Sequence, residues 1–254
     1  MLEARGLAKR YTTTTAIQDV SFIVKPYEIL GYLGPNGSGK STTVNIITAL
    51  IEPTHGEVLF EGRSIQSQLI EYKRRLGYVP EQPHLYPHLT GREYLQLAGR
   101  LRGLPRKTLD KKIDDLLQLF GLGAARHSPI ASYSKGMRQK VLISSALLHN
   151  PDVLVFDEPL SGLDVTSAMV FRNLVKSLAR DGKMILYSSH VLEVVEKLCT
   201  HVMILRKGQV VANDTVDGLR NLMHLASLED IFSELVLEQD IEMTANSIVD
   251  VMKA

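Results

Sequence analysis

The chain has 254 residues, which is enough for one or two domains with a sizeable core. Its 29 Lys and Arg residues nearly balance 28 Asp and Glu residues, so bulk charge gives no reason to expect a nucleic-acid partner. A hydrophobic content of 44% excludes a disordered chain, and no apolar run approaches the roughly 18 residues that span a bilayer. The single cysteine, Cys199, cannot form an internal disulfide, which indicates a reducing compartment.

The N-terminal part of the chain predicts a small antiparallel β layer beside the start of a buried sheet. Residues 2–9 and 16–24 are expected to be antiparallel strands, and residues 56–61 can join them. Residues 29–33 predict a buried strand, followed by a Gly-rich turn and a helix from about residue 40 to residue 51.

Two amphipathic helices are expected in the middle of the chain, over residues 92–101 and 108–120. The apolar stripe of the second helix consists of Leu109, Ile113, Leu116 and Leu117. The basic residues of this region are expected to form a solvated face with i,i+4 partners; they are Arg100, Arg102, Arg106 and Lys107. An all-helical insert in an α/β chain suggests a subdomain, which we place at about residues 85–150.

Strands and helices alternate in the rest of the chain. Further strands are expected at residues 76–79, 153–156, 184–188 and 202–206, and helices at 165–179 and 191–197. Strands buried on both faces and separated by helices imply a mainly parallel α/β sheet. Two short helices follow Asn213, at about residues 215–224 and 228–238. We therefore expect an α/β domain over residues 1–215 and a short helical appendix over residues 216–254.

A Gly-rich segment matches the phosphate-binding motif G-x-x-x-x-G-K-[ST]. Its residues are Gly34, Pro35, Asn36, Gly37, Ser38, Gly39, Lys40 and Ser41. Glycines let the backbone wrap phosphates closely, and the following helix N-terminus adds partial positive charge. Lys40 would supply a cation for the terminal phosphates and Ser41 a hydroxyl ligand for Mg²⁺. Because a strand precedes the motif and a helix follows it, a phosphate loop is favoured over an ordinary Gly-rich turn.

Two acidic residues, Asp157 and Glu158, follow the strand at residues 153–156. The carboxyl ends of buried parallel strands form the edge at which such sheets bind ligands. Asp157 could hold Mg²⁺ through water, and Glu158 could orient or deprotonate an attacking water. The alternative, a strand that ends in a solvated acidic turn, is disfavoured beside a phosphate loop.

Further motifs distinguish kinases, GTPases and transport ATPases, which all share the phosphate loop. Here they are Tyr11, Gln82, the segment Tyr-Ser-Lys-Gly-Met-Arg-Gln at residues 133–139, the segment Ser-Gly-Leu-Asp at residues 161–164, and His190. In this order they resemble the ATP-binding-cassette (ABC) ATPase family, over about residues 2–215. The resemblance implies an α/β, RecA-like P-loop NTPase fold with a mainly parallel sheet, a small antiparallel β layer and an inserted helical subdomain.

The resemblance also implies a role for each matching residue. Tyr11 would stack on adenine, the phosphate loop would extend to Thr42, and Gln82 would contact Mg²⁺ or the attacking water and sense the membrane partner. Ser134 and Gly136 belong to the signature segment, which would close over the γ-phosphate bound by a second subunit. Asp157 would be the metal-site residue, Glu158 the catalytic base, Asp164 a dimer contact and His190 a γ-phosphate contact.

The signature departs from the common Leu-Ser-Gly-Gly-Gln form, because Tyr133, Lys135 and Met137 replace the Leu, the first Gly and the Gln. This variant resembles the form found in ATPase subunits of bacterial exporters of drugs, polysaccharides, antibiotics or ions. We hypothesise that Lys135 brings a positive charge toward the nucleotide of the second subunit.

The expected function is therefore that of an ATP-binding and ATP-hydrolysing subunit of an ABC transporter, with ATP and Mg²⁺ and with export as the expected direction. It would act as a homodimer or as a heterodimer with another ABC ATPase, bound to an integral membrane permease at the cytoplasmic face of the cell membrane. The alternative is a soluble ABC ATPase in DNA repair, translation or iron–sulfur assembly. A single phosphate loop and a short helical insert count against that alternative.

Overall fold

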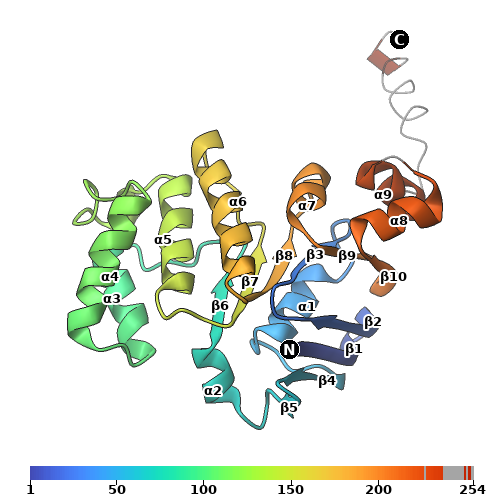
Figure 1. Ribbon diagram of the computed structural model, residues 1–254, viewed down its shortest axis with the longest axis horizontal. Helices are drawn as coiled ribbons and strands as arrows, with labels where there is room; N and C mark the ends of the chain where they lie inside the picture. Colours follow the sequence, from blue (N-terminus) through green and yellow to red (C-terminus); the bar gives the residue numbers. More distant parts are fainter. Residues whose placement is uncertain (226, 237–248, 250, 253–254) are drawn as a thin grey trace.

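The computed structural model describes residues 1–225, 227–236, 249 and 251–252 (Figure 1). Its larger sheet has six strands in the order β10-β9-β3-β8-β7-β6, and every pairing is parallel except the one between β9 and β10. The strands are β3 (Ile29–Leu33), β6 (Leu76–Val79), β7 (Val153–Asp157), β8 (Met184–Ser188), β9 (His201–Arg206) and β10 (Gln209–Asp214). The expected parallel α/β sheet is confirmed, whereas β10, a strand at the sheet edge, was not predicted.

A second, antiparallel sheet has the order β2-β1-β4-β5. Its strands are β1 (Leu2–Tyr11), β2 (Thr14–Val24), β4 (His55–Phe60) and β5 (Arg63–Ser64). Side chains of this layer share one core with the larger sheet and with α1 (Lys40–Ile47). The buried Tyr32 hydroxyl of β3, for example, donates to Thr43 Oγ1 of α1 at 2.8 Å. The expected small β layer is thus confirmed, and it covers the phosphate-loop helix.

Helix α1 ends at Ile47, four residues before the predicted end at residue 51. The Thr48 hydroxyl donates back to Val44 O at 2.8 Å, and Ala49 adopts a left-handed conformation with φ of 54°. A residue in that conformation cannot continue a right-handed helix. The prediction was wrong because the apolar pattern continues past the last helical residue.

Five helices pack with the larger sheet into its main core. They are α5 (Lys135–Leu147), α6 (Val165–Arg180), α7 (Leu192–Leu198), α8 (Val216–Met223) and α9 (Leu228–Val236). Buried Leu219 of α8 and Ile231 of α9 belong to this core, so these two helices of the appendix pack against the domain. The predicted second appendix helix extended to residue 238, and its last two positions lie outside the described residues. Cys199 is buried beside Gly31 of β3 and packs in the core.

The helical subdomain has a small core of its own. Its helices are α3 (Gly91–Leu101) and α4 (Arg106–Leu119), and the 3₁₀ turn Ile130–Ser132 leads from it toward α5. The predicted apolar stripe is confirmed, with Leu109, Ile113 and Leu117 buried and Leu116 partly buried. The short helix α2 (Leu69–Arg74), which precedes β6, was not predicted.

Arg102 does not lie on a solvated face, which corrects one expectation. Its guanidinium donates to Lys73 O at 2.7 Å and to Leu76 O at 2.8 Å, and it contacts His149 Nε2 at 2.7 Å. Arg102 thus ties the end of α3 to the segment that leads into β6. By contrast, Arg106 keeps the predicted i,i+4 partner, Asp110, at 3.9 Å.

Replacing Ile113 by Ala should destabilise the helical subdomain by about 2–5 kcal/mol, because it leaves a cavity among fully buried side chains. Leu119→Ala on the same helix is the matched control, since Leu119 is 80% exposed and its loss should change the stability by less than about 0.5 kcal/mol. Urea unfolding of both variants measures the difference. Equal stability of the two variants would contradict the assigned core.

Candidate nucleotide-binding site

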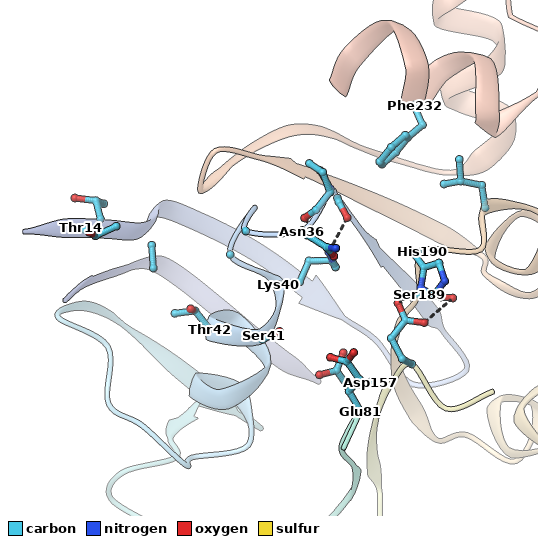
Figure 2. A pocket seen from close by; sticks show the side chains of 18 residues that line it. Thr14, Asn36, Lys40, Ser41, Thr42, Glu81, Asp157, Ser189, His190 and Phe232 are labelled. Atoms are coloured by element: carbon cyan, nitrogen blue, oxygen red, sulfur yellow. Dashed lines mark hydrogen bonds and ion pairs between the residues drawn. The ribbon is translucent and has the colours of Figure 1, made fainter. Parts of the chain in front are cut away.

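A cavity of about 690 Å³ opens at the carboxyl ends of the parallel strands (Figure 2). Its walls combine the phosphate loop, the start of β2, the residues after β6, β7 and β8, and one side chain of α9. Figure 2 shows Thr14 at one end of the cavity, Lys40 in the middle, and His190 with Phe232 at the other end. Ligands of open α/β sheets bind at this edge.

The phosphate loop has the backbone geometry that its glycines allow. Gly39 adopts φ of 105°, and a Cβ on it would lie 2.4 Å from Ile17 Cγ2 and 2.7 Å from Ala16 O. A side chain at that position would therefore push the loop away from β2. Ser38 Oγ is buried without a hydrogen-bond partner among the described residues. A tight loop with an unpaired hydroxyl at the start of a helix fits a polyphosphate ligand.

The Lys40 side chain folds back over the loop. Its ammonium donates to Gly34 O at 2.6 Å and to Pro35 O at 3.1 Å. Burial lowers the pKa of Lys40, whereas the nearby carboxylates of Glu158 and Asp157 oppose that shift. The ammonium is therefore held inside the concave face of the loop, where a bound phosphate would offer it stronger acceptors than carbonyl oxygens.

Asp157 ends β7 and is nearly buried beside Lys40. Burial raises the pKa of Asp157, and the carboxylates of Glu81 and Glu158 raise it further. Oxygen ligands and concentrated negative charge suit a hard divalent cation such as Mg²⁺, with the Ser41 hydroxyl in the same cavity as a second ligand. The donor set thus fits the metal that the phosphate-loop motif implies.

Glu81 was missed as a site residue. It lines the cavity two residues beyond β6, the strand adjacent to β7. The rule that pointed to Asp157 also applied to Glu81, since both lie at the carboxyl end of a parallel strand.

Glu158 and His190 form a pair at the same end of the cavity. His190 Nδ1 lies 2.8 Å from Glu158 Oε1, and Ser189 Oγ lies 3.4 Å from Glu158 Oε2. Glu158 has a left-handed backbone with φ of 47°, and its N–H donates to Ser188 O at 3.0 Å. A carboxylate oriented by a histidine beside a phosphate site can position and activate a water molecule.

Comparison with known proteins identifies the family. The model of the family "ABC transporter" matches residues 17–161, more than half of the chain. The chain belongs to the ABC transporter family. It is 40% identical over 92% of its length to the ABC transporter ATP-binding protein NatA of Bacillus subtilis, covering 96% of that protein. It is 35% identical over 84% of its length to the Nod factor export ATP-binding protein I of Ralstonia nicotianae, covering 66% of it.

Solved structures agree with this assignment. The structure of the ATP-binding subunit of an ABC transporter superposes with a TM-score of 0.87 and 36% identity. The match covers 92% of this chain and 99% of that subunit. The ATP-binding cassette MJ0796, solved as a dimer in a post-hydrolysis state with ADP and Pi, superposes with a TM-score of 0.78 and 27% identity. The match covers 85% of this chain and 98% of that cassette. The chain is therefore an ATP-hydrolysing subunit of an ABC transporter, with ATP as substrate and Mg²⁺ as cofactor. These relatives count against the alternative of an ABC ATPase without a role in transport.

Tyr11 and Gln82, which were predicted to contact the nucleotide or its metal, lie outside the cavity wall of this ABC ATPase. Tyr11 is exposed at the end of β1, where it pairs with Thr14, and Thr14 does line the cavity. Lys9 Nζ lies 5.4 Å from the centre of the Tyr11 ring. Gln82 is also exposed, next to the cavity-lining Glu81. Both predicted residues thus lie beside the cavity rather than in its wall.

The signature segment also lies outside the wall of the cavity that the described residues form. Ser134 is exposed and caps α5, with its hydroxyl accepting from Met137 N at 3.2 Å. Gly136 packs so closely on the segment at residues 161–164 that a Cβ on it would lie 2.5 Å from Gly162 O. The same glycine, Gly162, lies under the aliphatic part of Lys135. The stem of Lys135 is therefore a packing element between the two segments.

Asp164 belongs to this signature surface, which we define as residues 133–137 and 161–164. Its carboxylate caps α6 by accepting from Ser167 N at 2.9 Å, and Lys140 Nζ lies 3.8 Å away. The hydrogen bonds from Ser167 lower the pKa of Asp164.

Helix α5 is also linked to the catalytic segment. The buried Gln139 amide donates to Pro159 O at 3.0 Å, which connects α5 to the residues just after Glu158.

Replacing Asp157 by Asn should raise the thermal midpoint of the nucleotide-free protein at pH 7. A raised pKa means that the ionised carboxylate is less stable in the folded chain than in the unfolded chain. This destabilisation is present above the folded-state pKa and is relieved as the pH falls through it, so the difference between variant and wild type should shrink in acid. Asp115→Asn on the exposed face of α4 is the control. A lower midpoint for Asp157→Asn at pH 7 would contradict the assignment of Asp157 as a carboxylate that burial destabilises in the nucleotide-free protein.

Proposed function

We propose that this subunit works as a dimer of two copies, in which the signature surface of one copy completes the nucleotide site of the other. One observation carries the proposal. Lys40, Asp157, Glu158 and His190 line a single cavity, whereas Ser134 lies at an exposed helix start outside it. Within one copy, the described residues therefore leave the signature surface apart from the phosphate site that it would complete.

The residues of one copy would hold the nucleotide and the attacking water. Loop N–H groups and Lys40 would bind the β- and γ-phosphates, and Tyr11 would stack on the adenine at the far end. Ser41 and Asp157, together with Gln82, would hold Mg²⁺, which neutralises charge on the phosphates. Glu158 would accept a proton from the water and His190 would donate a hydrogen bond to a γ-phosphate oxygen.

The partner copy would add a helix N-terminus to the γ-phosphate. The first turn of α5 has unpaired N–H groups and a dipole that favours an anion, and Ser134 begins that turn. Asp164 lies on the same surface and would contact the partner across the dimer. ATP would thus link the two copies, and its hydrolysis would release them.

A membrane permease is the partner that the family implies, since ABC ATP-binding subunits drive transport through such proteins. Among the described residues, none of the helices has the length and apolar character needed to cross a membrane. We place the subunit at the cytoplasmic face of the membrane, with a short helix of the permease docked near Gln82 and the helical subdomain. Exposed Tyr86, which packs on Tyr94 of α3, offers an aromatic surface there.

Export is the direction of transport that we propose. The signature variant with Tyr133, Lys135 and Met137 resembles that of exporter subunits, and one relative, 35% identical, is named an export ATP-binding protein. Transport by vesicles that contain the subunit and its permease tests the direction. Uptake into inside-out vesicles is the expected result, and ATP-driven release from them would contradict it.

Mixing two inactive variants tests the composite site. Lys40→Ala removes the phosphate contact and Ser134→Arg blocks the signature surface, so each should be inactive alone. A mixed dimer has one site in which Lys40 of one copy meets Ser134 of the other, so mixing should restore part of the ATPase activity. Thermal unfolding controls for folding of each variant. If well-folded variants form mixed dimers without any activity, the composite site is wrong.

A further inference from the structure

In the part of the C-terminal appendix that the structure describes, one side chain lines the nucleotide cavity. Phe232 of α9 lines the cavity together with Leu192, the first residue of α7. Figure 2 shows the Phe232 ring directed toward the cavity at the end that holds His190, away from Thr14. Because His190 and its partner Glu158 are at this end, we take it as the end for the γ-phosphate.

Contacts at both ends of helix α9 determine where the Phe232 ring lies. The Ser227 hydroxyl accepts from Asp230 N at 3.1 Å, which begins the helix, and Leu228 and Ile231 are fully buried in the main core. At the other end of the helix, Arg206 of β9 donates to Leu235 O at 3.2 Å. The position of Phe232 therefore follows from packing on both sides of it.

Helix α9 also packs on α7, the helix that follows His190. Glu196 of α7 forms an ion pair with Arg220 of α8 and accepts from Leu228 N at 3.4 Å. The first residue of α7 has no side-chain cap before it, because Val191 occupies that position. The start of α7 therefore depends on packing, and Phe232 and Leu192 are the apolar side chains at its cavity side.

We propose that Phe232 is a positioning residue of the ATPase site, which closes the γ-phosphate end of the cavity and holds the His190 segment in place. This inference rests on the nucleotide site described under the proposed function. An apolar ring at this end would limit water to the molecule that Glu158 orients, and through the packing of α9 on α7 it would hold Leu192, two residues after His190. The appendix would thus contribute to the ATPase site as well as to the hydrophobic core.

A tryptophan in place of Phe232 tests whether the ring lies next to the bound nucleotide, because the chain contains no Trp and the new fluorophore would be unique. Phe232→Trp should show a saturable emission change with Mg²⁺ and ATP, and a smaller change with ADP. Leu222→Trp on α8 is the control, since Leu222 is 75% exposed and does not line the cavity. Binding of radiolabelled ATP is measured in the same samples. If ATP binds and the emission of Phe232→Trp stays constant, the inference fails; if ATP does not bind even to wild type, the proposed site fails.

Kinetics separate positioning from a purely structural role. Phe232→Ala should lower kcat on the order of tenfold while KM for ATP changes by less than about twofold, because phosphate binding does not use the ring. Phe232→Leu should recover most of kcat by restoring apolar volume. Leu235→Ala removes a partly buried side chain of the same helix outside the cavity, and so controls for loosening of α9. Equal kcat for Phe232→Ala and Leu235→Ala, with both folded, would overturn the proposal.

Discussion

Glu158→Gln should lower ATP turnover by roughly 10²–10⁴-fold while leaving ATP binding intact. The amide has nearly the shape of the carboxylate but cannot accept a proton from water. It can still form a hydrogen bond with His190, whose Nδ1 lies 2.8 Å from Glu158 in the wild type. The variant should therefore accumulate as an ATP-bound dimer, which size-exclusion chromatography with light scattering detects in the presence of Mg²⁺ and ATP.

The matched control for that variant is Asp115→Asn, which removes one negative charge at an exposed position of α4. It should remain as active as the wild type and should not accumulate as a dimer. A Glu158→Gln protein that stays monomeric and still hydrolyses ATP would contradict the assigned base and the dimer mechanism together.

Lys40→Ala should raise the Kd for ATP by about tenfold to a hundredfold, because a charged donor to the phosphates is lost. The ammonium also donates to two loop carbonyls, Gly34 O and Pro35 O, so the substitution removes two hydrogen bonds from the nucleotide-free loop, and thermal unfolding controls for its folding. Hydrolysis should fall further than binding, since Lys40 also stabilises the charge that develops during phosphoryl transfer. Titration with a fluorescent ATP analogue measures the affinity.

Lys107→Ala serves as the control, since Lys107 is exposed on the helical subdomain. Its ATP affinity should match that of the wild type. If both lysine variants bind ATP equally well, the cavity around Lys40 is not the site of the phosphates.

Local sequence rules predicted the centre of the site because its residues lie at the ends of single elements. The phosphate loop joins β3 to α1, and Asp157 ends β7, so a strand pattern and a motif are enough to place them. Once these strands are parallel members of one sheet, their carboxyl ends bring the phosphate loop and the acidic residues to the same edge. His190 follows β8 by the same logic.

The features that were missed depend on contacts between distant parts of the chain. Arg102 looks solvated in its own helix, but it is held by carbonyls of residues 73 and 76. Phe232 looks like a core residue of an amphipathic helix, but packing of α9 on α7 brings it to the cavity. No periodicity within one segment contains this information, because the partner lies in another element.

The signature surface shows an intermediate case. Ser134 and Asp164 each match a local capping pattern, and the structure has both caps. The close contact of Gly136 with Gly162, however, requires the starts of α5 and α6, which are distant in the chain, to lie side by side. This rigid contact makes the surface suited to act on a ligand as one unit.

A structure of the Glu158→Gln protein with Mg²⁺ and ATP tests the composite site most directly. We expect the N-terminus of α5 in one copy, beginning at Ser134, to lie within hydrogen-bond distance, about 3 Å, of the γ-phosphate held by Lys40 of the other copy. If residues 133–137 lie far from every γ-phosphate in every pairing of copies, the site is not shared between two copies.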